Sequence, residues 1–200
     1  MPTLEFFFDC GSPWTYLAFH KVEDLCEETG AELSWRPILV GGVFNEVNRE
    51  VYAARAEPNP LRARYHAKDL EDWARLYGLK IAWPSVFPVN SVKAMRGAIV
   101  AQDAGCLPAY ARAVFERYWG EDGDISQDDV IAEVAASVGL DAGFLEAIAE
   151  PAIKERLRAN TDELIRRGGF GSPTLFVDGD DMFFGNDRLP LVRASLERHV

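Results

Sequence analysis

The stretch from residue 8 to residue 19, FDCGSPWTYLAF, follows directly on the short apolar run TLEFFF at residues 3–8. A run of aromatic residues that ends in turn-forming residues is typical of a β-strand. After Pro13 the apolar residues recur with the spacing of a helix. Ser12 suits the N-cap of that helix, and Pro13 suits its first position. The stretch therefore predicts a strand that passes through one tight turn into a helix.

The residues that follow extend this pattern. Gly30 is a suitable helix stop, because glycine readily adopts the left-handed conformation found there. Residues 32–36, ELSWR, alternate polar and apolar side chains, as a half-buried strand does. A strand, a helix and a second strand favour a parallel pair with a right-handed crossover. The helix is expected to bury one face, formed by Trp14, Leu17, Ala18, Val22, Leu25 and Cys26.

The middle of the chain is predicted to be helical. Residues 41–64 are irregular and indicate a loop with a short helix, and residues 65–78 indicate a helix that stops at Gly78. The stretch WPSVFPVN at residues 83–90 contains two prolines and is expected to be a connector. Five further segments combine helical apolar spacing with polar residues at their starts. They are residues 91–105, 107–120, 126–139, 141–150 and 151–167.

The end of the chain returns to β-structure. Within residues 173–185, two short apolar runs surround the turn DGDD, which is typical of a hairpin. Residues 186–199 follow as a last helix, with Asn186 or Asp187 as its cap. The predicted order is β-α-β, a block of helices, and then β-β-α, which is an α/β fold.

Composition describes an acidic globular protein. The chain has 200 residues, of which 48% are hydrophobic and 26% charged, enough for one domain or one domain with an insertion. The net charge of −11 makes nucleic acid and anionic membranes poor partners, because their phosphate groups would be repelled. No apolar run reaches the roughly 18 residues of a membrane span, and the N-terminus lacks the pattern of a secretory signal.

The cysteines indicate a reduced, cytoplasmic protein with no metal site. Cys10, Cys26 and Cys106 are few, and their spacing matches neither a disulfide framework nor a zinc site. Cys10 lies two residues from Ser12, which leaves a redox role open. The simpler interpretation makes it a small residue at the strand end, with Cys26 and Cys106 facing the core. The three histidines are expected at the surface or as caps, and they are His20, His66 and His199.

Three pieces of the sequence resemble the 2-hydroxychromene-2-carboxylate isomerase family, which is related to kappa-class glutathione transferases and to the disulfide oxidoreductase DsbA. The resemblance implies a thioredoxin-like fold with an inserted all-helical domain. Residues 1–40 and 168–200 would form the thioredoxin-like domain, and residues 41–167 the insertion. The three pieces are FDCGSPWTYLA at residues 8–18, DLEDWARLYGL at residues 69–79 and GFGSPTLFVDGDDMFFGNDRL at residues 169–189.

In redox relatives the first helix starts with Cys-x-x-Cys, whereas residues 12–15 here are Ser-Pro-Trp-Thr. No thiol stands at these positions, so the motif cannot carry out dithiol exchange. The N–H groups and dipole of a helix N-terminus favour an anion, and such sites lower a thiol pKa from about 8.5. We therefore predict that glutathione binds as a cofactor with its sulfur on Ser12, the catalytic residue. The alternative is that Ser12 is only an N-cap, worth about 1 kcal/mol.

Two further segments are implied by the resemblance to bind glutathione. Pro173 matches a cis-proline, and the residue before it, Ser172, would pair through its backbone with the cysteinyl part of the ligand; the family more often has valine there. Gly185, Asn186 and Asp187 would hold the γ-glutamyl end, with backbone N–H groups for its carboxylate and Asp187 for its ammonium group. The alternatives are an ordinary edge-strand proline and simple helix capping.

The electrophilic substrate is expected between the thioredoxin part and the helical insertion, because binding pockets form at domain interfaces. Family members often carry a lysine, suited to a carboxylate substrate, where this chain has Asn45. Arg49, Arg62 or Arg64 could replace that charge. The substrate-binding candidates are Trp14, Asn45, Asn48, Trp83 and Phe87.

The resemblance implies an enzyme. It would be a glutathione-dependent isomerase that converts a 2-hydroxychromene-2-carboxylate-like intermediate of aromatic catabolism to trans-o-hydroxybenzylidenepyruvate, by reversible addition of the thiolate. The substrate partner is then a small aromatic carboxylate. One alternative is a kappa-like glutathione transferase or peroxidase, which consumes glutathione. Another is a non-catalytic thioredoxin-fold binding protein. The relatives are usually dimers, so a homodimer is expected.

Overall fold

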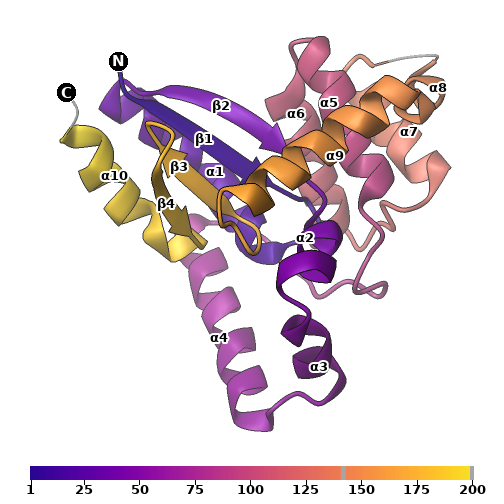
Figure 1. Cartoon of the computed structure of the whole chain (residues 1–200). Coiled ribbons are helices and arrows are strands. Elements are labelled where there is room, and N and C mark those ends of the chain that lie inside the picture. Colours follow the sequence, from indigo (N-terminus) through magenta and orange to yellow (C-terminus); the bar gives the residue numbers. More distant parts are fainter. Residues whose placement is uncertain (141–142, 199–200) are drawn as a thin grey trace.

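A four-stranded mixed sheet forms the centre of the molecule, and the computed structural model describes residues 1–140 and 143–198. The strand order is β2-β1-β3-β4. Strand β1 (Thr3–Phe8) pairs in parallel with β2 (Glu32–Pro37), and β3 (Thr174–Val177) pairs antiparallel with both β1 and β4 (Asp181–Phe184). Figure 1 shows helices on both faces of this sheet. The predicted strands, their hairpin and the parallel first pair are confirmed.

Helix α1 begins and ends where the sequence predicts. It spans Pro13–Thr29, and the N–H of Thr15 donates to the side-chain oxygen of Ser12 at 3.3 Å. Gly30 has a φ of 66°, which only glycine adopts without strain. These two local signals fix the two ends of the helix, and Ser12 places its N-terminus directly after the turn that follows β1.

The remaining helices follow in three groups. Helices α2 and α3 lead from the sheet into the long helix α4, and α3 and α4 extend away from the sheet as an arm (Figure 1). Helices α5 to α9 form the helical block, and α10 returns to the sheet. The helices are α2 (Val40–Val47), α3 (Glu50–Ala56), α4 (Pro60–Tyr77), α5 (Val92–Asp103), α6 (Leu107–Phe115), α7 (Asp128–Ser137), α8 (Phe144–Ala149), α9 (Pro151–Arg166) and α10 (Leu189–Glu197).

Residues 41–64 are more helical than predicted. Two short helices, α2 and α3, occupy most of this segment, and α4 already begins at Pro60. The side chain of Asn59 accepts hydrogen bonds from the N–H groups of Leu61 and Arg62 at 3.1 and 3.2 Å. This Asn-Pro start is an ordinary N-cap signal, which the polar composition of the segment obscured.

The ends of two other helices also differ from the prediction. Helix α6 stops at Phe115 and continues as a π-helical turn over Glu116–Gly120. Neither Asn186 nor Asp187 caps the last helix through its side chain, because a short 3₁₀ turn over Asn186–Arg188 precedes α10. The helix begins at Leu189, so the two polar side chains are not needed for capping.

The alternation of side chains in β1 divides the core in two. Phe6 and Phe8 point to the face covered by α1 and the helical block. Phe7 points to the opposite face, where it packs with Val43 of α2 and Leu164 of α9. The two central strands, β1 and β3, are therefore buried on both faces, as expected of strands that carry so few polar residues.

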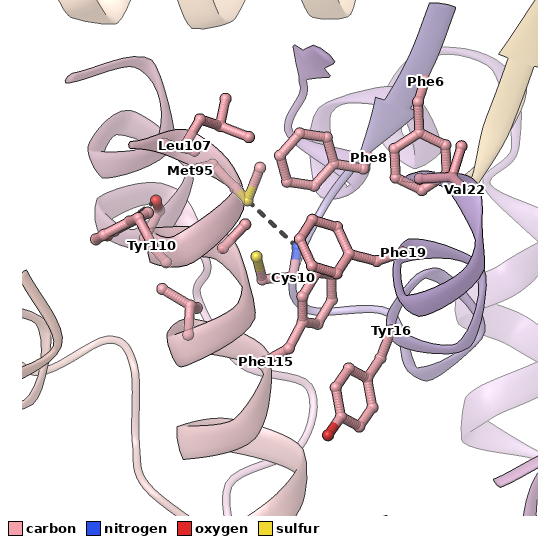
Figure 2. Close-up of a cluster of buried hydrophobic side chains, with 14 of the residues drawn as sticks. Phe6, Phe8, Cys10, Tyr16, Phe19, Val22, Met95, Leu107, Tyr110 and Phe115 are labelled. Carbon is pink, nitrogen blue, oxygen red and sulfur yellow. Dashed lines mark hydrogen bonds between the residues drawn. The ribbon is translucent and has the colours of Figure 1, made fainter. Parts of the chain in front are cut away.

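Cys10 lies fully buried in the larger core, surrounded by aromatic rings (Figure 2). Its N–H lies 3.3 Å from the sulfur of Met95, and Trp119 donates from Nε1 to its carbonyl oxygen at 2.9 Å. Burial raises the pKa of the Cys10 thiol well above its ordinary value, which disfavours the reactive thiolate. Cys10 is therefore the small buried residue at the strand end that the sequence predicts.

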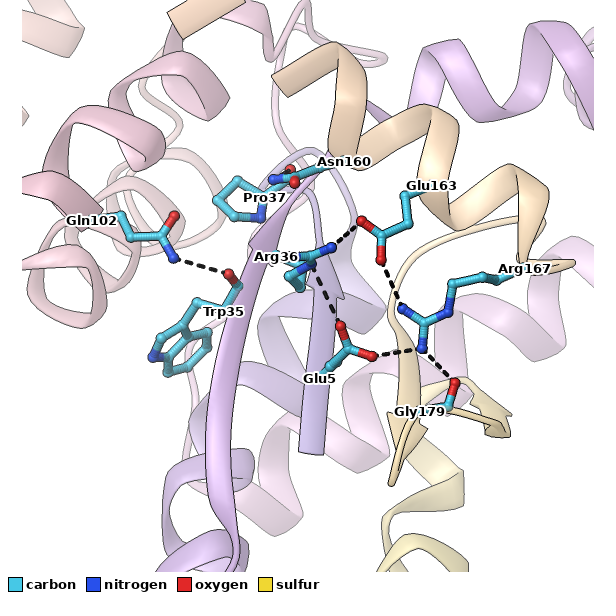
Figure 3. A network of polar contacts seen from close by, with 9 residues as sticks. All are labelled: Glu5, Trp35, Arg36, Pro37, Gln102, Asn160, Glu163, Arg167 and Gly179. Atoms are coloured by element: carbon cyan, nitrogen blue, oxygen red, sulfur yellow. Dashed lines mark hydrogen bonds and ion pairs between the residues drawn. The ribbon is translucent and has the colours of Figure 1, made fainter. Parts of the chain in front are cut away.

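A network of two arginines and two glutamates ties α9 to the sheet (Figure 3). Arg167 donates to Glu5 at 2.6 Å and to Glu163 at 3.1 Å, and Arg36 pairs with the same two glutamates. Arg167 also donates to the carbonyl oxygen of Gly179 at 2.7 Å. The network is half-buried and joins β1, β2 and α9, so it positions the helical block against the strands.

The division into residues 1–40 with 168–200 and an inserted 41–167 stays a prediction. One hydrophobic cluster contains residues of the sheet, α1 and the helical block together. Within the described ranges, no helix combines the length and apolar character that crossing a membrane requires.

Candidate active site

The hydroxyl of Ser12 faces the residue before Pro173. The Ser172–Pro173 peptide bond is cis, and Ser12 donates from Oγ to the carbonyl oxygen of Ser172 at 3.1 Å. The backbone N–H groups of Trp14 and Ser172 have no hydrogen-bond partner in the part of the chain that the structure describes. The first turn of α1 and the residue before Pro173 therefore each carry a backbone donor without a partner, and the Ser12 hydroxyl links the two segments.

The side chain of Ser172 braces this arrangement. Its buried oxygen accepts a hydrogen bond from the N–H of Asp9 at 3.0 Å and lies 2.7 Å from the hydroxyl of Thr15. Valine, which the family more often has here, could make neither contact. The serine thus connects the end of β1, the first turn of α1 and the segment before β3.

Asp9 is a buried carboxylate that sequence reasoning missed. It accepts hydrogen bonds from the N–H groups of Gly11 and Val40 at 2.8 Å and from the hydroxyl of Ser91 at 3.0 Å. Burial raises the pKa of the Asp9 carboxyl from 3.8, and the hydrogen bonds oppose this shift. The sequence feature that could have identified Asp9 is its position immediately after a buried strand and three residues before Ser12. Asp9 holds the turn, the start of α2 and the start of α5 together.

A cleft of about 330 Å³ opens on one side of the α1 N-terminus. We call it the first cleft. It brings together all the proposed glutathione-binding residues except Ser12, and helix α4 contributes three residues that the sequence analysis did not assign to the site. It is lined by Trp14, His66, Asp69, Trp73, Ser172, Pro173, Phe184, Gly185, Asn186, Asp187 and Arg188.

Asn186 is 3% exposed, and its side-chain nitrogen has no hydrogen-bond partner in the described residues. A buried amide without a partner is costly, typically by about 1–3 kcal/mol. Gly185 has a φ of 107°, and a Cβ there would lie 2.7 Å from the carboxylate of Asp187. The strand-to-helix turn is therefore shaped to bring backbone and side-chain polar groups to the cleft wall.

A second cavity of similar size, about 330 Å³, adjoins the turn before α1 at Gly11. We call it the second cavity. Its wall includes Gly11, the neighbour of Ser12, so it reaches the same helix N-terminus. It is lined by Gly11, Leu39, Val40, Gly41, Gly42, Phe44, Asn45, Tyr52, Arg55, Pro88, Val89, Asn90, Ser91 and Val92.

The candidates for substrate binding do not lie together in the structure. Asn45 lines the second cavity, but Trp14 lines the first cleft. Asn48 donates from its side chain to the carbonyl oxygen of Phe170 at 3.1 Å and lines neither. Trp83 is 61% exposed and packs on Phe87, with ring centroids 4.7 Å apart. Apolar character alone could not tell pocket from packing.

The arginines considered as replacements for the family lysine are not at the second cavity. Arg49 donates to the carbonyl oxygen of Asn45 at 2.6 Å, and Arg62 and Arg64 are exposed on α4. Arg55, on α3, lines the cavity instead. The sequence carried no signal for Arg55, because α3 was predicted to be irregular.

The other candidate ligands are inert or lie elsewhere. Burial raises the pKa of Cys26 to about 12, and no cysteine lines either cavity. His20 is half-buried, contrary to the surface position expected, and burial together with Arg112 and Lys21 lowers its pKa to about 4. His66 is exposed as predicted, and His199 lies outside the described residues. Among the described side chains, no cluster of histidine, cysteine and carboxylate groups is suited to a metal ion.

A family model described as a DSBA-like thioredoxin domain matches residues 3–197. The chain belongs to this family. It is 32% identical to a 2-hydroxychromene-2-carboxylate isomerase of Sphingobium xenophagum, over 97% of both chains. It is 30% identical to glutathione S-transferase kappa 1 of Homo sapiens, over 97% of this chain and 90% of the relative.

The fold agrees with this membership. A solved structure of a 2-hydroxychromene-2-carboxylate isomerase superimposes with a TM-score of 0.82 at 28% identity, covering 98% of this chain and 95% of the other. The predicted thioredoxin-like α/β fold, and the resemblance to the isomerases and the kappa-class transferases, are confirmed.

Proposed function

We propose that the protein is a glutathione-dependent isomerase acting on a 2-hydroxychromene-2-carboxylate-like aromatic acid. The observation that carries the proposal is the hydroxyl of Ser12 at a helix N-terminus, with one cavity lined by Gly11 and another by Trp14. The relatives named as isomerases, at about 30% identity over nearly the whole chain, support the reaction type.

In this proposal Ser12 donates a hydrogen bond to the thiolate of glutathione. Its hydroxyl turns from the carbonyl oxygen of Ser172 to the sulfur, and the N–H of Trp14 adds a second donor. Together with the helix dipole these groups favour the charged form of a thiol. A shift of two pKa units needs about 2.7 kcal/mol, which a donor and a helix terminus can largely supply.

The residues of the first cleft fit the rest of glutathione. The free N–H of Ser172 is available to the cysteinyl backbone, beside Pro173. The unpartnered side-chain nitrogen of Asn186 can donate to a carboxylate, and Asp187 can accept from an ammonium group. The orphaned amide of Asn186 is the structural reason to expect a polar ligand here.

Glutathione would supply a thiolate that adds reversibly to the conjugated substrate, so that the ring can open and a bond can rotate before the product leaves. The chain contributes the second cavity, where the substrate lies beside Gly11 and so next to Ser12. Asp9 keeps the turn between the two cavities in place through its three hydrogen bonds.

Steady-state kinetics with 2-hydroxychromene-2-carboxylate tests the proposal. Turnover should require glutathione, and the total glutathione concentration should stay constant over many turnovers. Stoichiometric loss of glutathione would support the kappa-like transferase or peroxidase, which the similarity to the human kappa-class enzyme keeps as the second candidate. If calorimetry detects no heat of glutathione binding, both the isomerase and the transferase proposals are contradicted, and a non-catalytic binding protein is favoured.

Two further properties belong to the same proposal. We propose a cytoplasmic location, in line with the few cysteines, and a homodimer, which the resemblance to the isomerase family implies. Sedimentation at micromolar concentration would test the dimer directly.

A further inference from the structure

Arg55 lies at the second cavity in an unusual environment. Its guanidinium carbon is 5.5 Å from the ring centroid of Phe44 and 5.4 Å from that of Phe87. Contact with two aromatic rings limits the freedom of a long side chain and keeps its charge at the cavity wall. The cation is therefore held in place without being neutralised.

No carboxylate pairs with Arg55 among residues 1–140 and 143–198, although the chain has a net charge of −11. Other arginines with structural roles, such as Arg36 and Arg167, each pair with two glutamates. An unpaired, aromatic-flanked guanidinium at a cavity wall is suited to an anionic ligand that carries a flat ring.

A second donor lies on the same wall. The hydroxyl of Tyr52 donates to the side-chain oxygen of Asn45 at 2.8 Å. This contact orients the amide, and the nitrogen of Asn45 makes no hydrogen bond with the described residues. Asn45 can thus donate to an oxygen held by Arg55 or to a neighbouring hydroxyl.

We infer that Arg55, held against Phe44 and Phe87, binds the carboxylate of a planar aromatic acid in the second cavity, with Phe44 beside the ring and Asn45 as a second donor. This inference rests on the proposed function and deepens it, because it assigns the charge that position 45 lacks. Since Gly11 lines the same cavity, an acid held there lies in a cavity that reaches the turn before α1.

A matched pair of fluorescent probes tests the inference, coumarin-3-carboxylate and its ethyl ester. The first carries the carboxylate and the second does not, while the ring is the same. Arg55→Met keeps most of the side-chain length and removes the charge, and Arg55→Lys keeps the charge. Arg62→Met is the control, because Arg62 is exposed on α4, away from the cavity.

We expect Arg55→Met to weaken binding of the acid by roughly 10- to 100-fold, the usual effect of losing a charge-assisted hydrogen bond. Binding of the ester should change by less than about threefold, and Arg55→Lys should recover part of the acid affinity. The Arg62→Met variant should bind both probes as the wild type does. Unfolding curves of each variant show whether the protein remains folded.

Equal losses for acid and ester would mean that Arg55 only packs on the rings, and unchanged acid binding would also overturn the inference. Glutathione titration distinguishes a failure of the Arg55 assignment from a failure of the proposed function. If the wild type binds glutathione and Arg55→Met leaves acid binding intact, only the assignment of Arg55 fails. If the wild type binds no glutathione, the proposed function fails.

Discussion

The two cavities on either side of the α1 N-terminus are built in different ways. The first cleft contains the buried amide of Asn186 and the segment before Pro173, together with exposed polar side chains such as Asp187 and Arg188. The second cavity is walled by α2, α3 and residues 88–92, and its polar side chains Asn45, Tyr52 and Arg55 are exposed. The first arrangement suits one defined ligand, and the second permits variation of the substrate.

The largest effect is expected from replacing Ser12, at the helix N-terminus that both cavities adjoin. Ser12→Ala should lower the glutathione-dependent kcat/KM by roughly 100- to 1000-fold, as the loss of one donor to a developing charge does. The pKa of the bound thiol should rise towards about 8.5, seen in the thiolate absorbance of the complex. Ser34→Ala, at an exposed serine of β2, is the control. An unchanged absorbance with a lower melting temperature would reduce Ser12 to a helix cap.

Asp9 joins the two cavities, so Asp9→Asn should damage both. The substitution adds an N–H group where three donors converge, and we expect a loss of roughly 2–3 kcal/mol in the free energy of unfolding. Urea unfolding measures this loss, with Asp129→Asn on the exposed start of α7 as the control. A loss no larger than that of the control would show that the turn is held by other contacts.

The pH dependence of the same pair of proteins gives a sign test. Because the folded pKa of Asp9 is raised above 3.8, the folded state binds the proton more tightly than the unfolded state. Its contribution to stability is then fully present below the unfolded pKa and is lost as pH rises through the folded pKa. The advantage of the wild type over Asp9→Asn should therefore shrink with rising pH above about 4. If the stability advantage of the wild type grew with rising pH, the pKa of Asp9 in the folded protein would be lowered and not raised.

A change in the first cleft alone should separate binding from stability. Asn186→Leu removes a buried amide that has no partner, so the free protein should keep or gain stability. Its affinity for glutathione should fall by roughly tenfold in calorimetry. Asn160→Leu is the matched control, because the amide of Asn160 donates to the carbonyl oxygen of Pro37 and its loss should only destabilise. Unchanged glutathione affinity in Asn186→Leu would remove Asn186 from the site.

The smallest expected effect concerns Ser172. Ser172→Val restores the residue more often found in the family and removes the hydroxyl contacts to Asp9 and Thr15. We expect a loss of about 1–2 kcal/mol in unfolding free energy. Glutathione affinity should change little, because the proposed contact is to the backbone. A large loss of affinity with unchanged stability would instead show a direct side-chain role.

Local signals predicted much of the fold. The caps of α1, the hairpin after Pro173 and the parallel first pair each depend on residues close together in the chain. The early start of α4 at Pro60 was missed although Asn59 signals it, since the surrounding residues are polar and irregular. Asp9 was not predicted to belong to the site, because nothing near it in sequence reveals the three groups that donate hydrogen bonds to its carboxylate.

For the candidate site, too, short segments of sequence were predictive and long-range packing was not. The segment at residues 12–15 and the segment at residues 172–173 were both identified from sequence, and packing brings them within hydrogen-bond distance. The contribution of α4 to the first cleft and of α3 to the second cavity was not predicted. Both depend on where a helical arm is placed, which no short stretch encodes.

By itself the sequence determined where α1 begins, that its first turn carries a hydroxyl in place of a thiol, and which later segment resembles a glutathione site. These features are local, because capping, strand alternation and turn chemistry act over a few residues. Only the tertiary structure decided what surrounds Ser12: the brace from Ser172, the buried Asp9 and the unpaired charge of Arg55. Those contacts join residues far apart in the chain, and their geometry follows from how the helices pack on the sheet.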